Sequence, residues 1–288
     1  MDYTDIFNKL PGAILPWYQL NKRQLPWRED RDPYHIWVSE IMLQQTRVEA
    51  VKAFYTRFLS ALPTIDALAN AEDDLLHKLW EGLGYYNRVR NMKKAARVIM
   101  DKFGGVFPSQ YADVISLPGI GAYTAGAICS IAFEQTTPAV DGNVLRIVSR
   151  LTNDATPVDS TDYKKAVAGA LVKIYPAQAG DFTQALMELG ATVCGPNRKP
   201  DCHKCPCEGF CQGYIQSTCE NLPIKLAKRQ RRVEEYTVFI LRCDGCYAVQ
   251  KRGNSGVLAG LWQFPNVLGK LSVDQAVAEM ENIGLKPK

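Results

Sequence analysis

Hydrophobic residues recur at helical spacing through about the first 210 positions of the chain, and strand-like alternation is scarce there. Apolar side chains that return every three or four residues mark the buried face of a helix. Proline and glycine interrupt this pattern at LPT, GLGYYN, FGGVFP and LPGIG, which divides it into separate helices. The pattern predicts helices over residues 33–46, 49–60, 72–80, 87–103, 110–116, 122–133, 142–152, 161–175 and 180–193.

The period of the pattern changes to two near residue 234, where apolar and polar residues begin to alternate. The stretches YTVFILRC and CYAVQKR flank Asp244-Gly245, a dipeptide typical of a two-residue hairpin turn. An amphipathic stretch, VDQAVAEMENIG, follows. One hairpin and one helix make a poor core. We therefore expect a helical domain over 1–211, a basic linker over 212–233 and a truncated second domain over 234–288.

The composition is that of an ordinary globular protein, with 47% hydrophobic and 22% charged residues among 288. A net charge of +4 is too small to indicate a nucleic-acid partner unless basic residues cluster locally. The segment KLAKRQRR (225–232) is one such cluster. No apolar run of about 18 residues is present, and the N-terminus is not a basic stretch followed by an apolar one. We therefore expect a cytoplasmic protein with no membrane partner.

Glu40 lies on an otherwise apolar face of the helix predicted at HIWVSEIMLQQT. The other residues of this face at helical spacing are Ile36, Trp37, Leu43 and Gln44. Burying an unpaired carboxylate costs several kcal/mol unless it is protonated or hydrogen-bonded. Either the fold satisfies Glu40 with a partner, or the site holds Glu40 with a raised pKa for chemistry.

Nine cysteines in a chain expected in the cytoplasm indicate metal binding or reactive thiols rather than disulfides. The loop 194–211 has the spacing Cys194-x7-Cys202-x2-Cys205-x5-Cys211, and these four thiolates suffice for an iron–sulfur cluster or a structural zinc ion. Cys207 is a spare that could replace Cys205 or Cys211. The remaining cysteines, Cys129, Cys219, Cys243 and Cys246, are scattered. Basic residues inside the loop, which predict a basic surface there, are Arg198, Lys199, His203 and Lys204.

The segment LPGIGAYTAGAICSIAF (117–133) predicts two helices joined by a tight turn. Gly119 and Gly121 allow the turn to expose amide N–H groups at a helix N-terminus. Such a turn can bind one phosphate, together with a monovalent cation, without reading sequence. The alternative is a plain packing corner between two helices.

Asp141 precedes the helix predicted in TTPAVDGNVLRIVSRL (136–151). It is either an N-cap, worth about 1 kcal/mol, or a carboxylate that faces a ligand, with Asn143 as its polar neighbour. Aromatic, amide and arginine side chains that suit the reading of nucleic-acid bases occur on either side of Glu40. They are Trp27, Arg28, Gln44, Gln45, Thr46, Tyr85 and Tyr86. Each of them could also belong to the ordinary core or surface.

Taken in order, SEIMLQQT, LPGIGAYTAGAI, VDGNV and the four-cysteine loop resemble the adenine DNA glycosylases of the MutY family. That family belongs to the helix-hairpin-helix glycosylase superfamily, which includes endonuclease III. The resemblance covers residues 5–211, and KRGNSGVLAGLWQFP resembles the start of the family's MutT-like domain. It implies a mainly α, two-lobed helix-hairpin-helix fold with a [4Fe–4S] cluster loop, followed by a partial α+β MutT-like (Nudix-like) domain. The spacing between the first two cysteines departs from the family pattern by one residue.

The resemblance also implies a monomeric, monofunctional enzyme of base excision repair. It would hydrolyse the glycosidic bond of adenine mispaired with 8-oxoguanine (or guanine) in double-stranded DNA. Glu40 is then the acid that protonates adenine at N7, and Asp141 stabilises an oxocarbenium-like sugar. Tyr123 and Asn143 support the site, and Tyr123 stands where lyase members carry a nucleophilic lysine.

The resemblance assigns further residues to the substrate, to phosphate and to the metal. Those implied to line the adenine pocket are Arg23, Trp27, Arg28, Leu43, Val48 and Gln184. Those implied to contact the substrate duplex are Gln44, Gln45, Thr46 and Tyr85. The hairpin glycines Gly119 and Gly121 would bind phosphate, and the cluster ligands would be Cys194, Cys202, Cys205 and Cys211. Glu188, one helical turn beyond Gln184, is expected to be structural.

Three other functions fit parts of the sequence. An endonuclease III-type mismatch or oxidised-pyrimidine glycosylase shares the hairpin and the cysteines, but Tyr123 and SEIMLQQT oppose it. A catalytically idle iron–sulfur DNA-binding module is opposed by the presence of both Glu40 and Asp141. A nucleotide hydrolase would need a glutamate-rich magnesium motif of the kind GxxxxxExxREUxEE, and nothing after residue 234 supplies it.

Overall fold

The computed structural model of the chain describes residues 3–196, 199–227, 233–253, 256 and 258–285. The chain forms two compact units, Met1–Leu226 and Ala227–Lys288. We call them the helical unit and the C-terminal unit. The helical unit extends beyond the predicted boundary at 211, because the backbone of Val158 donates to Ile224 and Asp159 accepts from the backbone of Leu226. Of the predicted basic linker, residues 228–232 lie outside the described residues, as does Arg198 of the cysteine loop.

The helical unit is built from helices that follow the predicted pattern closely. They are α1 (Thr4–Asn21), α2 (Pro33–Leu43), α3 (Val48–Ala61), α4 (Ile65–Asn70), α5 (Asp73–Trp80), α6 (Asn87–Phe103), α7 (Tyr111–Ser116), α8 (Ala122–Phe133), α9 (Gly142–Thr152), α10 (Thr161–Val172), α11 (Ala179–Thr192) and α12 (Gln212–Ile215). Short 3₁₀ turns occur at Pro26–Arg28, Cys202–Lys204 and Glu208–Phe210. The prediction of a mainly α fold is therefore confirmed.

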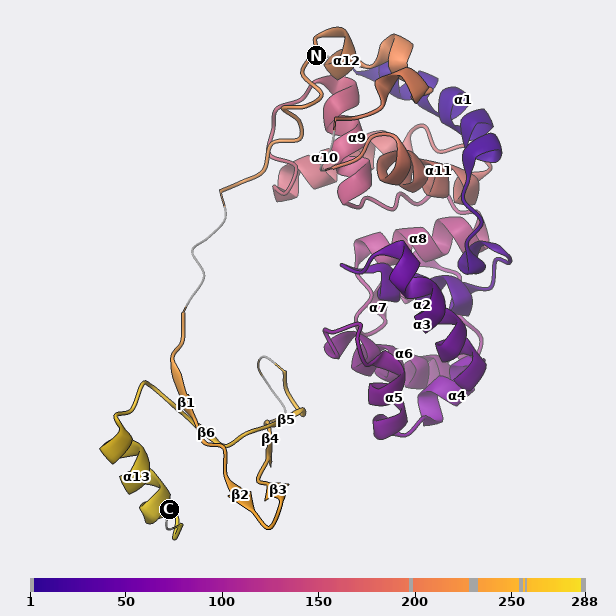
Figure 1. Cartoon of the computed structure of the whole chain (residues 1–288). Coiled ribbons are helices and arrows are strands. Elements are labelled where there is room, and N and C mark those ends of the chain that lie inside the picture. Colours follow the sequence, from indigo (N-terminus) through magenta and orange to yellow (C-terminus); the bar gives the residue numbers. More distant parts are fainter. Residues whose placement is uncertain (1–2, 197–198, 228–232, 254–255, 257, 286–288) are drawn as a thin grey trace. The chain divides into compact units, whose positions relative to one another are not determined.

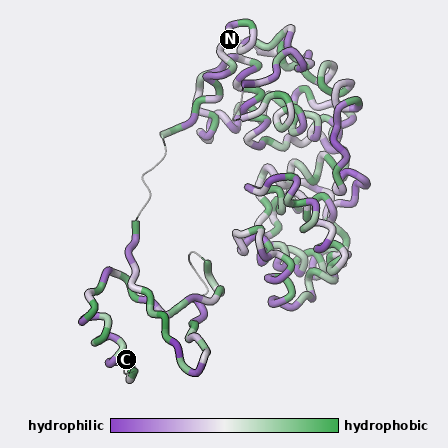
Figure 2. Tube along the Cα trace, in the orientation of Figure 1, coloured by the Kyte–Doolittle hydropathy of each residue, from purple (hydrophilic) through white to green (hydrophobic). Residues whose placement is uncertain are grey.

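Two hydrophobic cores divide the helical unit into two lobes (Figure 1). The first lobe contains α2 to α8, and large side chains such as Trp37, Phe58 and Trp80 fill its core. The second lobe contains α1, α9, α10, α11 and the cysteine loop, with Leu10 and Phe182 among its buried residues. Hydrophobic and hydrophilic residues alternate along these helices (Figure 2), as amphipathic packing requires. The chain therefore passes from the second lobe to the first after α1 and returns after α8.

Helix α1 was missed by the sequence pattern. It contains Pro11 and Pro16, which usually interrupt a helix because proline lacks a backbone donor. Its buried face, which includes Leu10, Ile14 and Tyr18, nevertheless keeps helical spacing. Burial of this face in the second lobe therefore outweighs the local cost of the two prolines.

Helix α2 ends at Leu43 rather than continuing to residue 46 as predicted. Gln45 adopts a left-handed conformation, with φ of 59°, which a helix cannot contain. The residues Gln44, Gln45 and Thr46 therefore form a turn between α2 and α3.

The C-terminal unit contains three two-stranded antiparallel ladders and one helix in its described part. The strands are β1 (Tyr236–Val238), β2 (Arg242–Cys243), β3 (Cys246–Tyr247), β4 (Gln250–Lys251), β5 (Trp262–Gln263) and β6 (Asn266–Leu268), paired as β1–β6, β2–β3 and β4–β5. The predicted hairpin turn is confirmed, because Asp244 and Gly245 both have positive φ. The predicted helix is α13 (Val273–Asn282). No helix in the described parts of either unit has the length and apolar character needed to cross a bilayer.

Candidate active site

Glu40 is buried in the last full turn of α2, with 5% of its surface exposed. Asp32 caps the start of this helix by accepting from the backbone of Tyr34 at 2.8 Å, and Pro33 occupies its first position. The Tyr123 hydroxyl, from the first turn of α8, donates to Glu40 Oε2 at 2.5 Å. Burial raises the pKa of Glu40 to about 7, although the hydrogen bond from Tyr123 opposes this change. Glu40 is therefore both partnered and substantially protonated near neutral pH, so the two alternatives that the sequence left open are combined.

Asp141 is the N-cap of α9, and its side chain is held by two hydrogen bonds. Oδ1 accepts from the backbone of Val144 at 2.8 Å, and Oδ2 accepts from the Asn143 amide at 2.6 Å. Burial raises the pKa of Asp141, while the donors from Val144 and Asn143 lower it in part. Asn143 is itself held by Arg146, whose Nη2 donates to Asn143 Oδ1 at 2.8 Å and whose Nε donates to the Cys194 carbonyl at 2.7 Å. The Asp141 side chain is therefore fixed in one orientation.

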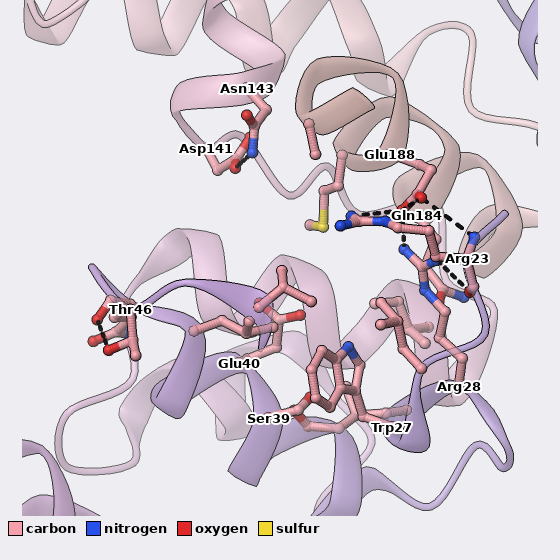
Figure 3. A pocket seen from close by; sticks show the side chains of 18 of the residues that line it. Arg23, Trp27, Arg28, Ser39, Glu40, Thr46, Asp141, Asn143, Gln184 and Glu188 are labelled. Carbon is pink, nitrogen blue, oxygen red and sulfur yellow. Dashed lines mark hydrogen bonds and ion pairs between the residues drawn. The ribbon is translucent and has the colours of Figure 1, made fainter. Parts of the chain in front are cut away.

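A cavity of about 350 Å³ brings these groups together at the junction of the lobes (Figure 3). This volume lies within the range of small-molecule sites. Glu40 reaches it from α2 in the first lobe, and Asp141 reaches it from the start of α9 in the second. The residues that line the cavity are Arg23, Leu25, Trp27, Arg28, Ile36, Ser39, Glu40, Leu43, Gln44, Gln45, Thr46, Val48, Tyr123, Ile131, Asp141, Asn143, Gln184, Met187, Glu188 and Ala191.

The lining contains most of the residues that the sequence singled out for the substrate. The structure places nine of them at the cavity: Arg23, Trp27, Arg28, Leu43, Gln44, Gln45, Thr46, Val48 and Gln184. Tyr85 is not among the lining residues. It is 65% exposed, with φ of 48°, in the loop between α5 and α6. Tyr123, to which the resemblance gives a supporting role, lines the same cavity as Asp141 and contacts Glu40 directly.

Glu188 lines the cavity in a salt-bridge network with two arginines (Figure 3). Arg23 Nε donates to Glu188 Oε1 at 2.6 Å, and Arg28 Nη2 donates to Oε2 at 2.7 Å. Burial alone would raise the pKa of Glu188, but the Arg23 and Arg28 guanidinium groups outweigh it and lower the pKa. Glu188 is therefore an ionised carboxylate in the wall of the cavity. The structural role expected of Glu188 stays a prediction, and the structure adds its position in the cavity wall.

The predicted hairpin forms between α7 and α8. Gly119 has φ of 80°, and a Cβ there would lie 2.6 Å from Cβ of Asn91, so glycine is required. Gly121 differs, since its φ is −101° and a Cβ would have open space. The packing of the protein therefore requires glycine at position 119 but not at position 121. Gly121 is the N-cap residue of α8, where exposed amide groups favour an anion.

Six cysteine side chains line one small apolar cavity in the second lobe: Cys194, Cys202, Cys205, Cys207, Cys211 and Cys219. Cys219, which the sequence left among the scattered cysteines, therefore joins the loop. Arg150 Nη1 donates to Cys194 Sγ at 3.2 Å, which suits an anionic sulfur centre.

The spread of these thiols bears on which group they could hold. Among the described residues, no three His, Cys, Asp or Glu side chains converge as ligands of one metal ion. The ligands of a single zinc ion must meet at about 2.3 Å from one point. The six cysteines around this cavity are compatible with the iron–sulfur cluster or zinc ion that the cysteine spacing predicts.

Comparisons with known proteins show the family of the chain. The family model described as HhH-GPD superfamily base excision DNA repair protein matches residues 38–172. The adenine DNA glycosylase of Homo sapiens is 37% identical over 89% of this chain, which covers 57% of the human protein. That of Buchnera aphidicola subsp. Baizongia pistaciae is 36% identical over 89% of this chain, which covers 73% of that relative. The chain belongs to the adenine DNA glycosylase family.

The fold of this adenine DNA glycosylase relative also matches solved structures. A thermostable thymine-DNA glycosylase is 29% identical with a TM-score of 0.68, and the match covers 75% of this chain and all of that one. A trapped endonuclease III–DNA covalent intermediate is 22% identical with a TM-score of 0.64, covering 75% and 99% of the two chains. These matches confirm the helix-hairpin-helix glycosylase fold. The chain spans about half the length of the Arabidopsis thaliana relative, which is 36% identical over 96% of this chain.

Arg88 of this family member joins the turn after α2 to the loop that carries Tyr85. Its Nη1 donates to the carbonyls of Ile41 at 2.7 Å and Gln44 at 2.8 Å. Its Nη2 donates to the carbonyl of Leu83 at 2.8 Å, and the guanidinium lies over the Tyr85 ring at 5.7 Å. One half-buried cation therefore fixes both segments. Nothing in the sequence pattern indicates this role, because an arginine in NRVR is typical of a helix surface.

Other cavity residues were missed because they are small or apolar. Met187 and Ala191 lie three and seven positions after Gln184 on α11, so helical spacing from Gln184 could have identified this wall. Ile131 on α8 and Leu25 near the first 3₁₀ turn carried no comparable indication.

Proposed function

We propose that the chain is a monofunctional DNA glycosylase that hydrolyses the N-glycosidic bond of adenine mispaired with 8-oxoguanine or guanine. The observation that carries this proposal is the pair of buried carboxyl groups, Glu40 and Asp141, which line one cavity and both have raised pKa values. Two carboxyl groups with distinct roles are what glycosidic bond hydrolysis requires. The relatives are named adenine DNA glycosylases, which supports adenine as the base that is released.

Glu40 supplies the proton. Adenine is a poor leaving group as an anion, so the base must be protonated as the bond breaks. With a pKa of about 7, Glu40 is protonated in a useful fraction of molecules at neutral pH and is still acidic enough to donate. The Tyr123 hydroxyl occupies Oε2, so Oε1 is the oxygen placed to deliver the proton to adenine N7.

Asp141 stabilises the sugar cation that remains. Its two hydrogen bonds favour the ionised carboxylate, although burial opposes it. A fixed carboxylate beside the developing positive charge stabilises an oxocarbenium-like transition state. Tyr123 supplies no amine, so no Schiff base forms at that position, and the proposal is for base release without strand cleavage.

The base must leave the duplex to reach the cavity. We propose that Arg23, Arg28, Gln184 and Glu188 read its polar edge while Trp27 and the apolar lining enclose its face. Exposed Tyr85, in the loop fixed by Arg88, is suited to enter the duplex beside the lesion, because base–aromatic stacking contributes about 1–3 kcal/mol per base. We propose double-stranded DNA that contains the mispair as the partner, bound by a monomer.

A [4Fe–4S] cluster held by Cys194, Cys202, Cys205 and Cys211 is the second part of the proposal. When bound, it would brace the loop structurally and supply no chemistry to base release. The exposed Lys199, His203 and Lys204 side chains on this loop would then face DNA phosphates. Iron and sulfide content, with visible absorbance that a zinc protein lacks, tests it. A monovalent cation at the hairpin stays a prediction of the sequence.

Product analysis tests the proposed activity. Duplexes with a single 8-oxoguanine·A, G·A, T·A or G·T pair would be incubated with the full chain, and released bases identified by mass. We expect adenine from the first two duplexes and no product trapped by borohydride. Release of thymine from G·T, or trapping of a covalent adduct, would favour an endonuclease III-type enzyme. Salt-sensitive binding without any base release would favour the idle module.

A further inference from the structure

The hairpin of the C-terminal unit places two cysteines directly opposite each other. Cys243 on β2 pairs with Cys246 on β3 across the two-residue turn formed by Asp244 and Gly245 (Figure 1). Asp244 has φ of 47° and Gly245 has φ of 79°, the left-handed pair that a type I′ turn requires. The sequence therefore contains a Cys-x-x-Cys motif whose two side chains lie on the same face of one ladder.

The ladder indicates how far apart the two cysteines lie. The backbone of Ala248 donates to the carbonyl of Leu241 at 3.0 Å, which marks these two residues as a hydrogen-bonded pair. Hydrogen-bonded pairs alternate along an antiparallel ladder, so Cys243 and Cys246 are also such a pair, with Cα atoms about 5.5 Å apart. Disulfides usually join Cα atoms about 4.4–6.8 Å apart. The Cα separation of this pair is therefore within the range that disulfides span.

Exposure separates this pair from the other thiols of the described chain. Cys243 and Cys246 are exposed, whereas Cys129 and the six cysteines around the second-lobe cavity are buried or half-buried. An exposed thiol can reach and attack a small-molecule disulfide, whereas a buried thiol is shielded from it. The Cys243 thiol lies 3.7 Å from a carboxylate oxygen of Asp244, to which it can donate.

We propose that Cys243 and Cys246 form a reversible dithiol–disulfide site, a position for redox modification separate from the adenine cavity and the cysteine loop. The oxidant is a small-molecule disulfide such as oxidised glutathione. One cysteine thiolate attacks it, forming a mixed disulfide and releasing one glutathione thiolate. The second cysteine thiolate then attacks the protein sulfur of that mixed disulfide and releases the second glutathione. The protein loses two electrons and two protons overall, and the oxidant becomes two thiols.

The small ring explains why this site is a switchable modification rather than a structural staple. The bond would close a loop of four residues, and short loops gain little stability from cross-linking. Exposed or strained disulfides are also the readily reduced ones. The pair therefore responds to the ratio of oxidised to reduced glutathione.

The sequence around the pair permits a direct test. Trypsin cleaves after Arg242 and Lys251, and the peptide between them, CDGCYAVQK, holds both thiols and no other cysteine. The full-length protein would be equilibrated in glutathione buffers of increasing oxidised fraction, quenched in acid, alkylated in denaturant and digested. We expect the doubly alkylated peptide to be replaced by a peptide that carries no alkyl group. The mass of that peptide should be two hydrogens below the mass of the free dithiol peptide. The internal disulfide should exceed glutathione adducts at this peptide by about tenfold or more, because the second thiol is tethered.

Two variants separate pairing from general thiol reactivity. Cys246→Ser should stop at a glutathione adduct on Cys243. Gly245→Ala, which forces a side chain into a left-handed position, should lower the ratio of internal disulfide to adduct by roughly tenfold. Independent adducts on both cysteines of the unmodified sequence, or a dithiol that persists in fully oxidised buffer, would overturn the proposal. An unchanged ratio in Gly245→Ala would refute the dependence on the hairpin.

Discussion

Replacing Glu40 by glutamine should stabilise the folded chain at alkaline pH and have little effect at acid pH. Burial raises the pKa of Glu40 from 4.5 to about 7 in the folded state. Below pH 4.5 the carboxyl is protonated in both the folded and unfolded states, so it causes no pH-dependent cost. Between pH 4.5 and 7 it ionises in the unfolded chain while it stays protonated in the folded one. The folded state therefore loses relative stability over this window, and the loss levels off above pH 7.

The difference between the two pKa values sets the size of the effect. A change from 4.5 to about 7 corresponds to about 3 kcal/mol of destabilisation once the pH exceeds both values. At pH 5 the linkage amounts to about 1 kcal/mol. Glutamine is uncharged at every pH and can still accept the hydrogen bond from the Tyr123 hydroxyl. The advantage of Glu40→Gln should therefore grow by about 2 kcal/mol between pH 5 and pH 8.

Urea unfolding of both proteins at several pH values, followed by proteolysis of the unfolded fraction, measures this difference. Glu49→Gln is the matched control, since Glu49 is an exposed glutamate on α3, and exposed ion pairs contribute about 1 kcal/mol or less. A stability difference between Glu40→Gln and the original sequence that stays constant from pH 5 to pH 8 would refute the raised pKa. The same result would also contradict the assignment of Glu40 as a proton donor at neutral pH.

Four further substitutions test other parts of the account. Asp141→Asn should keep the fold, because the new amide oxygen can still accept from the backbone of Val144, but it should abolish most adenine release. Loss of the cooperative melting transition would instead show that the main role of Asp141 is to cap α9. Gly126→Ala should destabilise the folded chain by about 1–3 kcal/mol, because its Cβ would lie 2.2 Å from the Pro138 carbonyl oxygen. Gly12→Ala, in open space within α1, should instead stabilise the folded chain by up to about 1 kcal/mol. Equal melting temperatures of the two variants would contradict this packing. Arg88→Lys should slow release from duplex DNA by roughly tenfold or more, because lysine cannot hold both carbonyl segments, and an unchanged single-turnover rate would argue against that role.

The sequence predicted those parts of the fold that depend on local pattern. Helical periodicity located most helices of both lobes, and the Asp244-Gly245 dipeptide predicted the turn that the structure contains. The apolar face around Glu40 correctly indicated a buried carboxyl group. Each of these features is specified by residues within one or two turns of the chain. Helix α1 was missed because local sequence opposes it. Pro11 and Pro16 are unfavourable within a helix, and packing against distant segments of the second lobe offsets their cost.

The site itself depends on contacts between distant segments, which periodicity does not report. Glu188 meets Arg23 across 165 positions of the chain, and Cys219 joins the cysteine loop through the packing of the second lobe. The partner of Glu40, Tyr123, lies 83 positions away on α8. Resemblance to a family identified most of the cavity residues, whereas the direct contact between Tyr123 and Glu40 is evident only in the folded structure.

Single-turnover release of adenine from an 8-oxoguanine·A duplex, measured for the original sequence and for Glu40→Gln, tests the central claim most directly. The account predicts release by the original chain and a loss of at least about 10²-fold in the variant, the usual contribution of a positioned acid. Duplex binding should be retained by both proteins. Release that survives at full rate in Glu40→Gln would show that another group protonates the base and would contradict the assignment of the cavity.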